Sequence, residues 1–240
     1  MAACLTFDGQ TLAVSASRVE AGRQAAEGIA LIAADVLAQA GWGRAVAPPE
    51  GAALADSQPV EPDCVVVVVG PGSLPGVGRG WGVGGVGGWG AHAVVRGVRG
   101  GEAMARVLEA GRDCDSAPEG SGGGGGRARS GEGLAGWLVV TAARRGRVFV
   151  EDRSGVRAVA EGQLAPALLA GRWLIAGEAR GALPLPGAVL SELTHPTAEQ
   201  IAHAALQRLT GALPAREALP LYVDPPEAKL PADGLRATPV

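Results

Sequence analysis

The sequence is poor in the residues on which many active sites depend. Aromatic side chains make up only 3% of the 240 residues, and histidine occurs three times. The three cysteines, Cys4, Cys64 and Cys114, lie far apart and are odd in number, which argues against a disulfide framework or a Cys-x-x-Cys metal site. We therefore expect reduced thiols, no metal site in this chain, and a core filled by valine, alanine and other small aliphatic residues.

Strong positive charge and long apolar runs are missing as well. The formal net charge is −3, whereas a dedicated nucleic-acid binder needs clustered Lys and Arg for its phosphate contacts. No apolar run approaches the roughly 20 residues that a membrane-spanning helix requires. The stretch that begins at Met1 has neither the basic nor the long apolar region of a signal peptide. These deficits predict a cytoplasmic protein without a membrane partner.

Glycine and proline are abundant, with 39 and 17 residues, and the most informative of them follow a run of valines. Valine is stiff at χ1, and an apolar run without alternation predicts a strand at Cys64–Val69 that is covered on both faces, as in a parallel sheet. The strand stops at the turn Gly70-Pro71-Gly72-Ser73. Its glycines permit backbone angles closed to other residues, and Ser73 is a candidate cap for a following helix.

Periodicity and turn residues predict the other elements. Asp8-Gly9 between two strand-like runs predicts a hairpin. His195-Pro196-Thr197 opens a helix near the end of the chain, with Thr194 or Thr197 as its candidate cap. The remaining elements are a helix at 20–40, strands at 93–98, 137–141, 147–150 and 173–177, and short helices at 102–109 and 164–169.

Glycine-dense stretches supply motif matches of low specificity. Gly82–Gly87 fits G-x-G-x-x-G, but it lacks the preceding strand and the later acidic residue of a dinucleotide site. We therefore expect no nucleotide binding by this chain alone. The low-complexity stretch at 116–133 is expected to be disordered.

Three segments in order resemble the bacterial TsaB (YeaZ) family, the dimerization subunit in threonylcarbamoyl-adenosine modification of tRNA. They read Val-Val-Gly-Pro-Gly-Ser-Leu-Pro-Gly-Val at 68–77, Ala-Arg-Arg-Gly at 143–146, and a tail in which Tyr222 is followed by Pro-Glu-Ala at 226–228. The resemblance runs from about the hairpin to the tail.

The resemblance implies an α/β, actin-like (ASKHA, RNase H-like) fold of two lobes. Residues 1–100 would form the first lobe, with a helix within 191–215 packing back on it. Residues 101–190 would form the second lobe with the Gly-rich insert, and 216–240 the tail. Family members open with a further strand before the hairpin, so the resemblance implies that the first, central strand is missing here. We expect unpaired edges and a hole in the core as a consequence, and favour a true start upstream of Met1.

The resemblance also implies a non-catalytic scaffold that pairs with a TsaD-type catalytic subunit, with a TsaE-type ATPase joining. ATP and metal are expected on these partners, no cofactor on this chain alone, and tRNA is reached only through the complex. The expected partner interface comprises residues of the first helix and of the Gly-Pro-Gly-Ser region: Ile29, Ile32, Ala33, Val36, Leu37, Gly70, Pro71, Gly72, Ser73, Gly76, Val77 and Trp81.

Two alternatives stay open. Departures from the family pattern at Pro75, Gly78, Ala142 and Asp224 favour a drifted paralog without the modification role. A metal-independent, peptidase-like hydrolase of the same fold is the other, although no serine is placed with a histidine and a carboxylate by a recognisable local signature.

Overall fold

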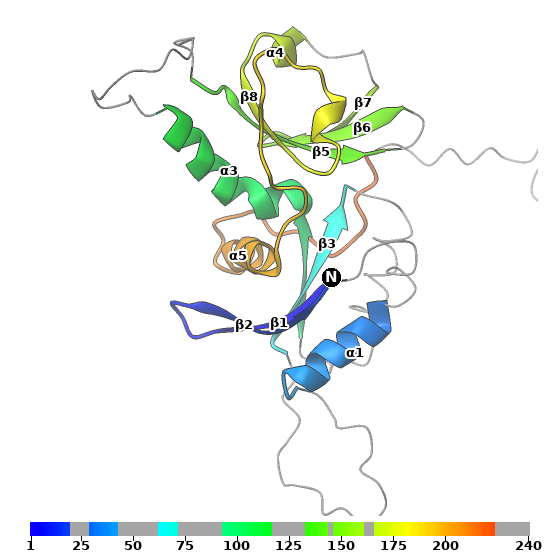
Figure 1. Ribbon diagram of the computed structural model, residues 1–240. Helices are drawn as coiled ribbons and strands as arrows, with labels where there is room; N and C mark the ends of the chain where they lie inside the picture. Colours follow the sequence, from blue (N-terminus) through cyan, green and yellow to red (C-terminus); the bar gives the residue numbers. More distant parts are fainter. Residues whose placement is uncertain are drawn as a thin grey trace, which may run out of the picture.

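The computed structural model describes residues 1–19, 29–42, 62–71, 93–116, 133–143, 146–160 and 166–223. Mixed α and β elements follow one another along these ranges (Figure 1). Their bounds are β1 (Ala2–Phe7), β2 (Leu12–Arg18), α1 (Ile29–Gln39), β3 (Cys64–Gly70), β4 (Val94–Arg99), α3 (Gly100–Ser116), β5 (Gly136–Ala142), β6 (Arg147–Asp152), β7 (Gly155–Ala160), α4 (Pro166–Leu169), β8 (Trp173–Ala176), the 3-10 helix η2 (Arg180–Ala182), β9 (Val189–Leu190) and α5 (Ala198–Leu209).

The described residues of the first half form two separate two-stranded sheets. β1 and β2 form the antiparallel hairpin predicted around Asp8, whose Oδ1 accepts the N–H groups of Gln10 and Thr11 at 2.8 and 2.7 Å. β3 and β4 pair in parallel, as the valine run predicts. Within the described residues no strand pairs with both sheets.

Helix α5 covers both of these small sheets. Of the two candidate caps, Thr197 is the one that caps it, because its hydroxyl accepts the N–H of Gln200 while the Gln200 side chain accepts the N–H of Thr197. The helix contacts strands of both sheets, and its Ala204 and Ala205 pack against Val98 and Ala103. These small side chains let α5 approach β4 and α3 closely.

The second half is built on a five-stranded sheet of order β7-β6-β5-β8-β9. α3 covers one face, where Met104 and Leu108 pack on Trp137, Val139 and Leu174. The other face carries a second cluster of buried side chains: Leu138, Val140, Val148, Val150, Val159, Leu168, Ile175, Leu183 and Leu185. α3 thus lies between the five-stranded sheet on one side and α5 on the other (Figure 1).

The segment after α5 returns to the first half and crosses the end of the β3–β4 sheet. The N–H of Gly97 donates to Arg216 O at 3.3 Å, and the N–H of Leu221 donates to Val69 O at 2.9 Å. A Cβ at Gly97 would lie 2.8 Å from Val69 Cγ1 and against the carbonyl of Glu217, so only glycine lets this segment lie so close. The described residues of the tail therefore pack across the end of the β3–β4 sheet.

No helix within the described ranges has both the length and the apolar character needed to cross a membrane.

Candidate functional site

The carboxyl ends of β3 and β4 lie side by side and define the candidate site. Gly70, the last residue of β3, pairs with Arg99, the last residue of β4, and α3 begins at the next residue. In open α/β sheets ligands bind beyond the carboxyl ends of parallel strands, and a helix N-terminus there favours an anion. Any ligand chemistry of the β3–β4 pair is therefore expected at this edge.

The structure places only part of the predicted partner interface at this edge. Gly70 is buried with φ of +122°, and a cis peptide bond joins it to the half-buried Pro71. Five further predicted interface residues, namely Gly72, Ser73, Gly76, Val77 and Trp81, lie outside the described residues.

The predicted interface residues of α1 lie elsewhere, on the helix that covers the β1–β2 sheet. Ile32 and Val36 are 2% and 1% exposed and pack against Cys4, so they belong to the core of the chain itself. Ala33 and Leu37 are half-buried, and Ile29 is the first residue of the helix. The outward face of α1 carries Leu31, which is 74% exposed. A partner that approaches α1 would meet this outward face.

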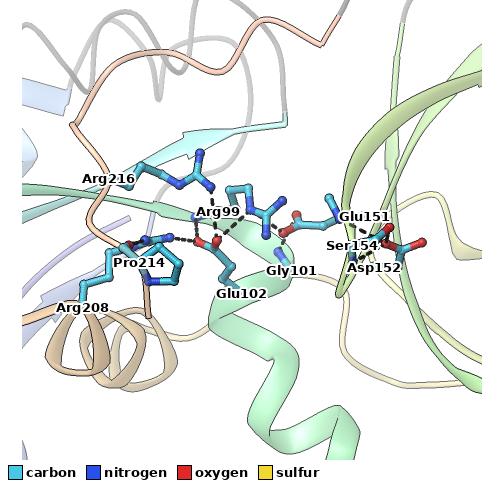
Figure 2. A network of polar contacts seen from close by, with 10 residues as sticks. Arg99, Gly101, Glu102, Glu151, Asp152, Ser154, Arg208, Pro214 and Arg216 are labelled. Carbon is cyan, nitrogen blue, oxygen red and sulfur yellow. Dashed lines mark hydrogen bonds and ion pairs between the residues drawn. The ribbon is translucent and has the colours of Figure 1, made fainter. Parts of the chain in front are cut away.

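At the carboxyl edge the structure gathers a network of charged side chains that the sequence did not reveal (Figure 2). Its centre is Glu102 in the first turn of α3. Glu102 accepts the N–H of Arg99 at 3.0 Å and its Nε at 2.8 Å, and it pairs with Arg208 of α5 and, at 3.5 Å, with Arg216. Three guanidinium groups from β4, α5 and the following segment therefore converge on one carboxylate.

A second carboxylate reaches the same place from the five-stranded sheet. Glu151 of β6 is fully buried, and its Oε2 accepts the N–H of Gly101 at 2.8 Å. Its Oε1 lies 3.2 Å from Arg99 Nε. A Cβ at Gly101 would lie 2.7 Å from Glu151 Oε2, so this approach requires glycine in the first turn of α3.

The two carboxyl groups titrate in opposite directions from their ordinary values. Burial raises the pKa of Glu151 to about 7, although Arg99 and the Gly101 N–H oppose that rise. Burial also acts to raise the pKa of Glu102, but the hydrogen bond from Arg208 and the contacts with Arg99 outweigh it and hold that pKa below its usual range. Near neutral pH Glu102 is therefore ionised, while Glu151 is close to the middle of its titration.

Groups of the chain itself thus occupy the edge where a ligand would be expected. The Glu151 carboxyl lies at the N-terminus of α3, and the segment Arg216–Leu221 crosses the ends of β3 and β4. Within the described residues no group of three or more His, Cys, Asp or Glu side chains could hold a metal ion. What the geometry shows is a charged junction that ties β4, α3, α5 and β6 together.

Sequence reasoning missed this junction because its members are far apart in the chain. Two local signals were present. Gly100-Gly101 stands between a strand and an acidic first helical turn, and Glu151 follows the apolar residues Val148–Val150 of a strand. Neither signal says that Arg208 or Arg216 would meet Glu102.

Comparison with known proteins places this arrangement in a fold class. The chain has a mixed α/β fold that matches, over most of its length, the fold of solved YeaZ-related structures. YeaZ from Pseudomonas aeruginosa has a TM-score of 0.55 and 16% identity, over 89% of this chain and 91% of that one. An uncharacterized protein with similarity to peptidase YeaZ, from the same organism, has a TM-score of 0.51 and 17% identity, over 82% and 83%. No family model and no curated protein matches the sequence.

Proposed function

We propose that this chain is a non-catalytic scaffold subunit of a tRNA threonylcarbamoyl-adenosine modification complex. Its partner is a TsaD-type catalytic subunit, and a TsaE-type ATPase joins them. ATP and metal belong to the partner subunits, and tRNA is reached through the complex.

The observation that carries this proposal is the likeness to YeaZ across both halves of the chain. The likeness covers most of the chain, and it agrees with the three ordered motifs that resemble the TsaB family. The geometry of the candidate site supports a scaffold role too, since Glu151 and the segment Arg216–Leu221 fill the carboxyl edge of β3 and β4.

The outward face of α1 is the surface through which we propose that the partner binds. Its apolar residue Leu31 is 74% exposed, while Ala34 and Ala38 are exposed one and two turns further along the same face. The exposed Asp35, which pairs with Arg18, borders this apolar strip, and the small side chains of Ala34 and Ala38 let a second helix approach closely. The two buried residues Ile32 and Val36 hold α1 on the β1–β2 sheet and so orient this face.

Co-purification with the TsaD-type subunit of the same organism tests the proposal. We expect a stable complex on size exclusion for the 240-residue chain. Leu31→Glu should weaken that complex by about tenfold or more, because it places a charge in the centre of an apolar contact. The matched control is Leu190→Glu on the edge strand β9, where the leucine is 54% exposed; it should leave the complex unchanged.

The other outcomes are equally informative. A folded chain that forms no complex would favour the drifted paralog. Cleavage of peptides by the purified chain would favour the hydrolase. A complex that tolerates Leu31→Glu would retain the scaffold role but remove α1 from the interface.

A further inference from the structure

Glu151 is the one fully buried carboxyl group among the described residues, and it joins two parts of the fold. It comes from β6 of the five-stranded sheet, yet both of its oxygens face the β4–α3 junction (Figure 2). Oε2 accepts the Gly101 N–H at 2.8 Å, and Oε1 lies 3.2 Å from Arg99 Nε without a hydrogen-bond partner of good geometry. A buried carboxylate held this way is incompletely compensated when it is ionised.

The charged groups around Glu151 come from every element packed against it. Arg99 at the end of β4 attracts the ionised form, but its Nε lies closer to Glu102, at 2.8 Å. The Glu102 carboxylate on α3 repels the ionised form, while the backbone N–H of Glu102, like that of Gly101, favours it. Arg208 of α5 and Arg216 of the following segment contact Glu102. Glu151 therefore shares Arg99 with the Glu102 carboxylate, and Glu102 has two further arginine partners of its own.

The strand neighbours of Glu151 give it no further counter-charge. Its register partners are Val139 on β5 and Val156 on β7. The adjacent Asp152 is engaged with Ser154 and Arg157 at the β6–β7 turn. Loss of the Glu151 proton thus leaves a negative charge beside Glu102 in a place that water does not reach.

We propose that Glu151 is a proton-controlled latch, whose neutral form closes the contact between β6 and the first turn of α3 and whose ionised form loosens it. When the junction opens, the carboxyl is hydrated and returns to its ordinary acidity. Deprotonation therefore favours the open junction. Burial raises the pKa of Glu151 to about 7 from its ordinary value of 4.5, so opening becomes more favourable as the pH rises between these two values and levels off above the higher one.

The hydrogen-exchange rate of the Gly101 amide reports directly on how often the contact opens, because that N–H donates to Glu151. The rate in the wild-type chain is compared with that in Glu151→Gln at each pH, so that the intrinsic pH dependence of exchange cancels. The amide side chain of this variant would keep an oxygen for the Gly101 N–H but cannot ionise. From a folded pKa of about 7 and an open-state value of 4.5, the ratio of the two rates should rise about thirtyfold between roughly pH 5.5 and roughly pH 8.5.

Glu109→Gln is the matched control on the same helix. Glu109 pairs with Arg153 of the β6–β7 turn, but it is 39% exposed and water screens its charge. The Glu109→Gln chain should keep the pH dependence of the wild type. A ratio of wild-type to Glu151→Gln rates that stays flat over this pH range would overturn the latch.

A direct titration of the Glu151 carboxyl carbon in the wild-type chain, followed by NMR, covers the case in which Glu151→Gln does not fold. A midpoint near 7 would support the latch, and a midpoint below about 5 would overturn it, because the group would then be ionised in the closed junction at no penalty.

Discussion

Replacement of Glu102 by glutamine is the sharpest test of the charged junction. The change keeps the size of the side chain but removes the carboxylate on which three guanidinium groups converge. Arg99 would keep Glu151 as a partner. Arg208, whose side chain is 1% exposed, would keep its hydrogen bond to the carbonyl of Pro214 but would lose its ion pair with the Glu102 carboxylate. An arginine left buried without its counter-ion costs about 3–5 kcal/mol.

That loss is a large share of the roughly 5–15 kcal/mol by which domains of this kind are stable. Urea unfolding near neutral pH measures it, with the buried Trp137 as a fluorescence reporter. Glu102 is fully ionised under these conditions, because its pKa lies below its usual range. The contribution is present above the ordinary carboxyl pKa and is lost as the pH falls through the lowered value.

Two further variants decide whether the reasoning holds. Glu109→Gln, which removes an ion pair with the 61% exposed Arg153, should change the free energy of unfolding by about 1 kcal/mol or less. Adding Arg208→Met to Glu102→Gln should restore much of the lost stability, since an apolar side chain needs no counter-ion. A Glu102→Gln chain that loses less than about 1 kcal/mol would refute the view that Arg208 depends on this carboxylate.

The two glycines of the junction give further predictions. Gly101→Ala should destabilise the fold by about 1–3 kcal/mol in urea unfolding, because the new methyl group meets Glu151, and the effect should shrink when Glu151→Ala removes the obstacle. Gly97→Ala should lower the free energy of unfolding by a similar amount, roughly 1–3 kcal/mol, because the methyl group meets the Glu217 carbonyl. The same clash should raise the proteolysis rate of the segment after α5, and an unchanged rate would contradict the placement of that segment.

Local patterns predicted much of the fold. The five valines of β3, the Asp8-Gly9 turn and the Thr197 cap each act over a few residues, so their effect can be read from the sequence. The strands β7 and β9 were missed, since β9 has two residues and β7 lacks a strong apolar alternation.

The candidate site was predicted less well than the fold. The turn after β3 lies next to the start of α3 because β3 pairs with β4. The sequence alone does not show that pairing. Ile32 and Val36 were assigned to a partner interface because of the resemblance to the TsaB family, whereas the apolar spacing that they share is what a helix needs to pack against its own sheet, and there they lie. The junction of Glu102, Glu151 and Arg208 depends on long-range packing that no local pattern encodes.

The division of the first half into two small sheets has a consequence for how the chain folds. An isolated two-stranded sheet is marginal in water, and α5, which covers both sheets, begins only at Ala198. At a synthesis rate of about 5–20 residues per second, the valine strand β3 is therefore made roughly ten seconds before helix α5, which covers it. A bare run of valines is prone to intermolecular strand pairing in that interval, so a chaperone that holds nascent chains should raise the yield of this protein more than that of a fold with local contacts.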